Sequence, residues 1–159
     1  LFVKPVSRTS IITAKLTAAF CNIVILNIVT FVSSLILVGK YSKGEVVTGD
    51  IAITMAGMFL LQLLFMVIGS SLAAVKRKSK AAASLATGIL LLTYVISVAI
   101  DLNENIEGLK YLTPFKYFEA KNVMFGGGFE MVYVILSLVM IGAFLAITYL
   151  FYQKRDLNV

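Results

Sequence analysis

Four long stretches without a charged residue dominate the hydrophobic pattern of this chain. They run over residues 16–38, 51–75, 81–100 and 131–152. Each reaches the length of about 20 residues that an α-helix needs to cross a hydrocarbon core of roughly 30 Å. No stretch alternates polar and apolar positions as membrane-barrel strands do, and backbone groups in lipid must bond within their own helix. The pattern therefore predicts an all-α integral membrane protein with four transmembrane helices.

The amino-acid composition agrees with lipid as the main solvent. Of the 159 residues, 60% are hydrophobic and 14% are charged, and the mean hydropathy is +0.97. A soluble domain is about half apolar and about a quarter charged. The single cysteine, Cys21, rules out an internal disulfide, and the chain contains no histidine, so we expect no metal site. We interpret residues 1–159 as one transmembrane domain.

Basic residues concentrate on one side of the four predicted spans. That side holds nine basic residues and one acidic residue, whereas the other side holds five basic and seven acidic residues. The side richer in lysine and arginine stays in the cytoplasm. Both ends of the chain and the loop 76–80 are therefore predicted to be cytoplasmic. Because the net charge of +6 follows this topology, it does not indicate binding to nucleic acid.

The loop between the second and third stretches carries the densest run of charge. Lys76, Arg77 and Lys78 follow one another, and Lys80 comes next but one. Such a run anchors the topology and contacts anionic headgroups of the lipid bilayer, or it forms a docking surface for a cytoplasmic partner. The loop is short enough that the two flanking spans must form an antiparallel hairpin.

The segment between the third and fourth stretches is longer than a simple connection between helices. Thr113 suits an N-cap and Pro114 suits the first position of a helix, so we predict a short interfacial or re-entrant helix near residues 113–125. The glycines at 126–128 would end it. An ordered loop with an aromatic belt is the alternative. The expected apolar side of the helix is made of Leu112, Phe115, Phe118 and Val123.

Few polar residues interrupt the predicted spans. They include Asn22 and Asn27 in the first span and Gln62 in the second. Amides in membrane helices usually bond to another helix, and the alternative is that they line a transport pathway. No charged residue lies deep within a span. This absence argues against a carrier driven by protons or sodium ions, which normally needs such a group.

Sequence signatures of an enzyme are absent. The phosphate-binding loop is not formed, because Asp50 rather than lysine follows Gly44 and Gly49. The chain has no histidine to serve a catalytic triad. We therefore expect no catalytic residue and no cofactor in this chain. Any energy for transport would come from another chain.

Three segments resemble one family of membrane proteins. The first is Lys4-Pro5-Val6-Ser7-Arg8 with Ile11 and Lys15, the second runs from Leu112 to Phe118, and the third from Phe151 to Leu157. In this order, and on these sides of the membrane, they resemble the permease subunits of type-2 ATP-binding-cassette (ABC) exporters. Members of that family have six spans, so the resemblance implies that this chain corresponds to the last four.

The resemblance also implies partners and a location. A cytoplasmic ABC ATPase subunit would bind ATP and Mg²⁺, a second permease copy would complete the pathway, and the protein would lie in the plasma membrane. The mechanism would be alternating access driven by closure of the ATPases. Under this resemblance, ATPase coupling falls to Pro5, Ser7, Arg8, Lys76, Arg77 and Lys78. The alternative for the first three is a helix start, with Ser7 as its cap and Arg8 in contact with lipid headgroups. The outer gate falls to Pro114, Phe115, Tyr117 and Phe118.

Two other functions remain as alternatives. A small four-span multidrug carrier would need a carboxylate embedded in the membrane, and the spans contain none. A non-transporting membrane scaffold or accessory subunit would have no associated ATPase. Neither alternative accounts for the three segments that resemble the exporter family.

Overall fold

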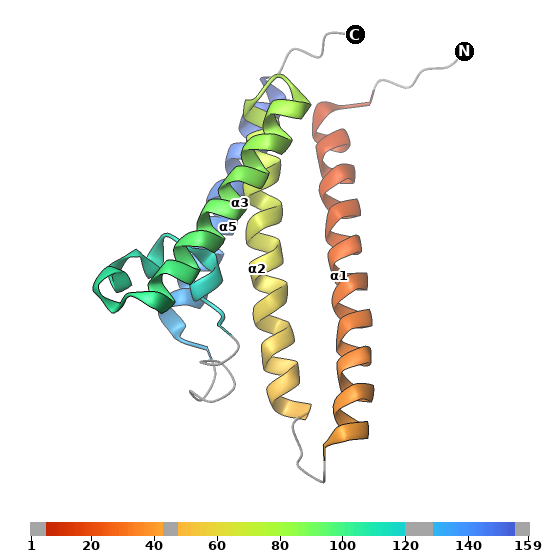
Figure 1. Ribbon diagram of the computed structural model, residues 1–159. Coiled ribbons are helices and arrows are strands. Elements are labelled where there is room, and N and C mark those ends of the chain that lie inside the picture. The colour runs from red at the N-terminus through yellow and green to blue at the C-terminus, as the bar shows by residue number, and fades with distance from the viewer. Residues whose placement is uncertain (1–5, 43–47, 120–128, 155–159) are drawn as a thin grey trace.

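The described part of the chain is a bundle of long helices. The computed structural model describes residues 6–42, 48–119 and 129–154. Four of its helices are long and apolar enough to cross a membrane, which confirms the predicted all-α integral membrane protein (Figure 1). The α-helices are α1 (Arg8–Tyr41), α2 (Thr48–Val75), α3 (Ser79–Leu102) and α5 (Met131–Gln153), and the 3₁₀ helices are η1 (Glu104–Tyr111) and η2 (Pro114–Lys116).

The first helix is longer than its uncharged stretch. Helix α1 begins about two turns before the predicted start at residue 16, because the Ser7 hydroxyl caps it by accepting a hydrogen bond from the Ser10 N–H at 3.1 Å. The charge of Lys15 does not interrupt its backbone bonding. With 34 residues, α1 is about 51 Å long. The other three helices begin and end within three residues of the predicted stretches.

Helix α2 lies at the centre of the bundle and packs against α1, α3 and α5. Helices α2 and α3 form the predicted antiparallel hairpin. The first residues of α1, the α2–α3 turn and the last residues of α5 meet at one end of the molecule (Figure 1). We call this the basic end, because it carries Arg8, Lys76 and Lys154. The opposite half of the molecule, in which η1 and η2 lie beside α2, is called the acidic end, because it carries Asp50 and Glu130.

Buried side chains form two clusters, and further buried positions such as Val67 lie well inside α2. In the larger cluster, Leu64 of α2 packs with Tyr117, Phe118 and Tyr133. At the basic end a smaller cluster joins α1, α2 and α5, and it consists of Ile12, Ala74 and Tyr152. Most apolar side chains in the middle of α1 are exposed, as expected where lipid tails are the solvent. The two ends therefore position the helices relative to one another.

Candidate functional site

At the basic end, Arg8 joins the start of α1 to the end of α5. Its guanidinium donates a hydrogen bond of 2.8 Å to the carbonyl oxygen of Gln153, the last residue of α5. The last carbonyls of a helix lack partners within the helix, and a cation is favourable there. A second polar contact lies one turn further in, where the hydroxyls of Thr13 and Tyr149 are 2.9 Å apart. We call these two contacts the α1–α5 clasp.

The clasp was not predicted from the sequence. The sequence predicts that Arg8 serves ATPase coupling or, alternatively, contacts lipid headgroups, whereas its bond to Gln153 joins residues that are 145 positions apart. Ser7 is exposed and acts as the N-cap of α1. Pro5 lies outside the described residues. The coupling role of these residues stays a prediction.

The basic turn between α2 and α3 is accessible. Lys76, Arg77 and Lys78 are all exposed, and they lie at the same end as Arg8. In the described ranges, acidic residues occur only toward the acidic end. The basic end thus presents positive charge to whatever faces it. This arrangement suits both predicted roles of the turn, contact with anionic headgroups and contact with a partner surface.

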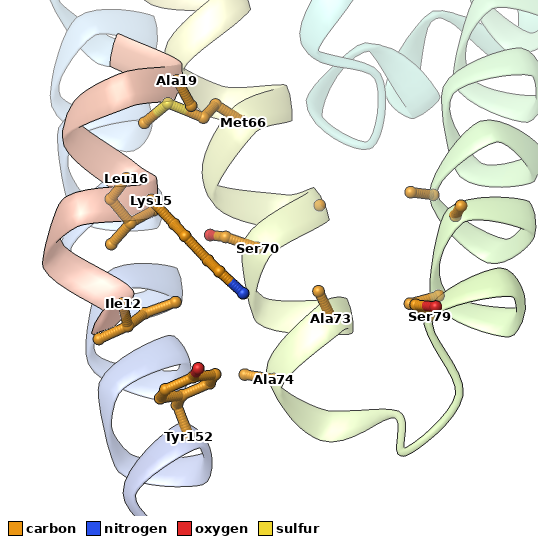
Figure 2. Close-up of a pocket in the computed structure, with 14 residues that line it drawn as sticks. Ile12, Lys15, Leu16, Ala19, Met66, Ser70, Ala73, Ala74, Ser79 and Tyr152 are labelled. Atoms are coloured by element: carbon orange, nitrogen blue, oxygen red, sulfur yellow. The ribbon is translucent and has the colours of Figure 1, made fainter. Parts of the chain in front are cut away.

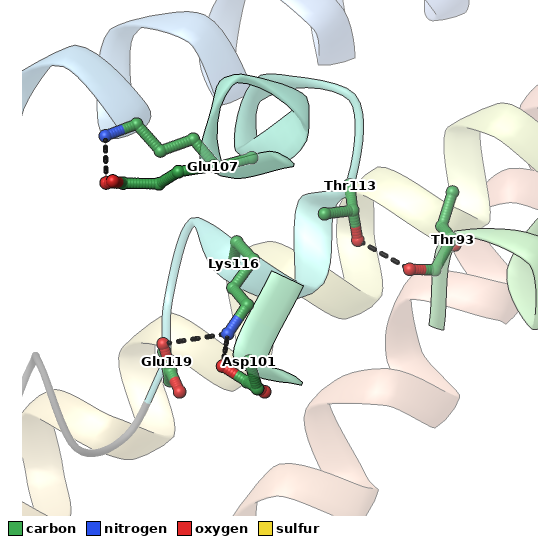
Figure 3. Close-up of polar contacts among 7 residues, drawn as sticks. Thr93, Asp101, Glu107, Thr113, Lys116 and Glu119 are labelled. Carbon is green, nitrogen blue, oxygen red and sulfur yellow. Dashed lines mark hydrogen bonds and ion pairs between the residues drawn. The ribbon is translucent and has the colours of Figure 1, made fainter. Parts of the chain in front are cut away.

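At the acidic end, Thr113 makes a contact different from the predicted one. It stands at the N-cap position of η2, but its hydroxyl does not cap the helix. Instead, the Thr113 Oγ1 donates to the carbonyl oxygen of Thr93 in α3 at 2.8 Å (Figure 3). Thr113 is therefore the N-cap residue as predicted but makes no side-chain cap, because its full burial against α3 places a helix carbonyl within reach of its hydroxyl. The bond attaches the η2 segment to α3.

The short helix predicted near residues 113–125 begins as expected at Pro114. It is a 3₁₀ helix that ends at Lys116, while residues 120–125 lie outside the described ranges. The 3₁₀ helix η1 precedes it, and this second element is consistent with a helix pair in this segment. The side chain of Leu112 was expected on an apolar side but is 65% exposed. It lies before the first turn of η2, so no helical face carries it inward.

Aromatic side chains of the η2 segment pack between three of the spans. The Phe115 ring lies 5.1 Å from the Phe65 ring of α2 and 5.6 Å from the Tyr94 ring of α3. The Tyr117 ring stacks on Tyr133 of α5, with centroids 5.1 Å apart and an angle of 18° between the planes. We call residues 114–118 the aromatic wedge. It contacts three of the long helices at once.

Phe118 completes the aromatic wedge by packing on a glycine of α2. A Cβ atom added to Gly57 would lie 3.1 Å from the Phe118 Cβ and 3.2 Å from a ring carbon of Phe129. A side chain at this position would force both aromatic neighbours to move by a few tenths of an ångström. Sequence reasoning missed Gly57, although it singled out Phe118. Nothing in the local pattern of α2 marks this glycine as different from the others.

Lys116 of the aromatic wedge has a buried side chain that pairs with two more exposed carboxylates. Lys116 bonds to Asp101, and its ammonium lies 3.4 Å from Glu119 (Figure 3). Its side chain is only 8% exposed. Burial lowers the pKa of Lys116, but the bond to Asp101 and the charges of both carboxylates outweigh it and raise the pKa above its usual value. The pKa of Tyr117 is also raised, chiefly because burial disfavours the phenolate.

The predicted pathway residues separate into a pair and a single residue. Asn27 of α1 donates to the side-chain oxygen of Gln62 in α2 and also to the carbonyl oxygen of Ile23, at 2.9 Å. Among the described residues, the Oδ1 atom of Asn27 is buried without a hydrogen-bond partner. Asn22 lies exposed on another side of α1. The Asn27–Gln62 contact is the interhelical bond expected of such amides, and a role in lining a pathway stays a prediction.

One pocket opens between α1, α2 and α3 in the half of the bundle near the basic end. Its volume is about 580 Å³. Its walls come from all three helices, with Tyr152 of α5 at its base, and the Lys15 side chain reaches into it from α1 (Figure 2). The sequence did not predict this pocket. Lys15 had been counted only as one of the basic residues on the cytoplasmic side.

The four long apolar helices define a multi-pass membrane protein. Residues 1–157 match the family model described as "ABC-2 family transporter protein". The chain therefore belongs to the ABC-2 family, which confirms the resemblance to type-2 ABC exporters and makes the chain a membrane permease of ABC type. Membrane proteins of this family generally work with a cytoplasmic ATPase. Neither the curated proteins nor the solved structures searched contained a match.

Proposed function

We propose that this chain forms part of an export pathway and couples to a separate cytoplasmic ATPase through its basic end. The observation that carries the proposal is the α1–α5 clasp, which makes the exposed start of α1 continuous with the end of α5. The partner ATPase binds ATP and Mg²⁺, and this chain contributes no cofactor or catalytic residue. The basic end faces the cytoplasm of the plasma membrane, by the excess of lysine and arginine there.

The packing suggests how movement at the basic end reaches the opposite end. A displacement of Arg8 shifts both α1 and α5, and the cluster of Ile12, Ala74 and Tyr152 passes it to α2. At the acidic end the aromatic wedge lies between α2, α3 and α5. Relative movement of these helices would loosen the wedge. Pro114, Phe115, Tyr117 and Phe118 thus serve as the proposed outer gate in an alternating-access cycle.

The proposed pathway uses both the polar pair and a second permease copy. Asn27 has a buried acceptor atom that α1 and α2 leave unused among the described residues, so it is a candidate to bind a polar group of the transported molecule together with Gln62. Asn22 would contribute from the exposed side of α1. A second copy would enclose the pathway where α1 now presents apolar side chains outward.

Co-purification tests the coupling. The full-length gene product is tagged, purified in a mild detergent and analysed by mass spectrometry for a stoichiometric ATPase subunit. We expect the ATPase to be present with the wild type and largely lost with Arg8→Glu. Lys40→Glu is the matched control, since it makes the same charge change at the far end of the same helix, and it should retain the ATPase.

Two outcomes would contradict parts of the proposal. If the ATPase remains bound after Arg8→Glu and also after a triple change of Lys76, Arg77 and Lys78 to glutamate, the basic end is not the coupling surface. If no ATPase accompanies the wild type, the scaffold alternative is favoured. Thermal unfolding of each variant shows whether a loss of binding comes from a loss of folding.

A further inference from the structure

The pocket between α1, α2 and α3 combines apolar walls with a single cation. Small side chains and a glycine line most of it, and Lys15 is the one charged residue among the described residues that form it. Its volume of about 580 Å³ lies within the range of ligand sites in proteins. The glycine and alanines that line it are Ala19, Gly69, Ala73, Ala74, Ala82, Ala83 and Ala86.

Lys15 of α1 is an exposed residue whose side chain extends into this pocket. Its side chain crosses from α1 toward Ala73 of α2 (Figure 2), and no hydrogen bond or ion pair joins its ammonium to another described residue. A lysine in a membrane helix usually directs its ammonium to water or to an anion at the interface. In the described ranges, carboxylates occur only toward the acidic end of the bundle, so the described residues supply no counter-charge for Lys15.

A second favourable feature for an anion lies on the opposite wall. Helix α3 begins at Ser79, which lines the pocket, and its N-cap residue Lys78 makes no side-chain capping bond. The first N–H groups of a helix lack partners within it and carry partial positive charge, which favours phosphate. Lys15 and the start of α3 thus approach the pocket from two sides. The basic turn of Lys76, Arg77 and Lys78 lies directly before the start of α3.

We propose that this pocket binds one anionic glycerophospholipid of the leaflet at the basic end. The phosphate would lie between the Lys15 ammonium and the first turn of α3, and an acyl chain would lie along the alanine and glycine walls. Basic pockets between membrane helices are known to bind anionic headgroups in this way. The proposal uses the proposed function only for the orientation of the basic end, and it does not require an ATPase.

Native mass spectrometry of the full-length gene product in a neutral detergent tests the site. Phosphatidylglycerol and phosphatidylcholine are added in parallel, and the fraction of protein that retains each lipid is measured. We expect Lys15→Gln to weaken phosphatidylglycerol binding about fivefold, because one lysine near the headgroup contributes roughly that factor. Lys15→Arg should restore it. Lys40→Gln, which removes a lysine from the other end of α1, should leave it unchanged.

A second variant tests the apolar part of the site. A Cβ added to Gly69 meets no atom within 4 Å, so Gly69→Leu fills the pocket while the helix can keep its fold. It should reduce the binding of both lipids. Thermal unfolding with inorganic phosphate distinguishes a lipid from a free anion, since phosphatidylglycerol should raise the melting temperature and inorganic phosphate should not.

Three results would overturn the lipid site. One is phosphatidylglycerol binding that is equal in the wild type and Lys15→Gln. Another is an equal shift in melting temperature from inorganic phosphate, which would remove the acyl contact. The third is unchanged lipid binding in Gly69→Leu together with a smaller assembly mass, which would place a helix of a second copy in the pocket. All three readouts are independent of ATPase co-purification, so this site and the proposed coupling can fail separately.

Discussion

The two ends of the bundle are held together by different kinds of contact. At the acidic end, Thr113 and Tyr117 are buried, and aromatic rings fill the space between three helices. At the basic end, a smaller buried cluster around Ile12 is supplemented by hydrogen bonds between α1 and α5 at accessible positions around Arg8 and Thr13. Burial of aromatic area contributes several times more free energy than an exposed polar contact. The acidic end is therefore the stiffer end, and the basic end can exchange its contacts with water or a partner.

The largest effect is expected from removal of the central ring of the wedge. Tyr117→Ala should lower the free energy of unfolding by about 3 kcal/mol, because a buried aromatic is truncated beside Tyr133. Tyr41→Ala is the control, since Tyr41 is 73% exposed, and it should have little effect. Unfolding in detergent, followed by circular dichroism, compares the two. Equal losses would contradict a stiff acidic end.

Two glycines of the same helix give a matched test of close packing. Gly57→Leu should destabilise the protein by about 1–3 kcal/mol, because the added side chain collides with Phe118 and Phe129. Gly69→Leu enters open space and should not destabilise it. Thermal unfolding of both variants measures the difference. If Gly57→Leu is tolerated as well as Gly69→Leu, the wedge does not rest on α2.

A smaller effect is expected at the basic end. Arg8→Gln should lower the free energy of unfolding by about 1 kcal/mol, because it removes one hydrogen bond and one favourable charge from the end of α5. Lys154→Gln removes a nearby exposed charge and serves as the control. Hydrogen exchange of the last turn of α5 should rise in Arg8→Gln alone. A rise in both variants would mean that general charge, and not the clasp, protects that turn.

The smallest effect concerns alkaline pH at the acidic end. The folded-state pKa values of Lys116 and Tyr117 are both raised, so each group favours folding below its unfolded pKa, and that contribution is lost as pH rises through the folded value. The melting temperature of the wild type should therefore fall between about pH 10 and pH 12. Lys116→Met should be less stable at neutral pH and should fall less over this range. Parallel curves for the two proteins would contradict a role for Lys116.

The long uncharged stretches predicted the four spans. The bias of basic residues predicted that both chain ends and the loop 76–80 lie on one side of them. This succeeded because lipid imposes helix formation on any uncharged stretch of sufficient length. The same reasoning placed the start of α1 too late, since hydropathy shows where a helix enters lipid and not where its backbone bonding begins. Ser7 as a cap and Pro114 as a helix start were readable because both are local signals.

The contacts that build the two ends could not be predicted in this way. Arg8 bonds to Gln153, and Thr113 bonds to Thr93, across separations that no local pattern encodes. Lys15 shows the same limit. Its charge was visible in the sequence, but its position on a pocket wall depends on how α2 and α3 pack beside α1. The sequence thus identified which residues could form a site. The residues that they contact are determined by how the helices pack.

The length of α1 has a mechanical consequence. A rod of about 51 Å cannot fit upright within a hydrocarbon slab of roughly 30 Å, so it must protrude or tilt. The segment between Arg8 and Lys15, which the uncharged stretch does not include, is the part that would stand out at the basic end. A force on that segment would rotate the rigid helix about the region where the membrane holds it. A small sideways force there would swing the opposite end of α1 in the other direction without bending the helix.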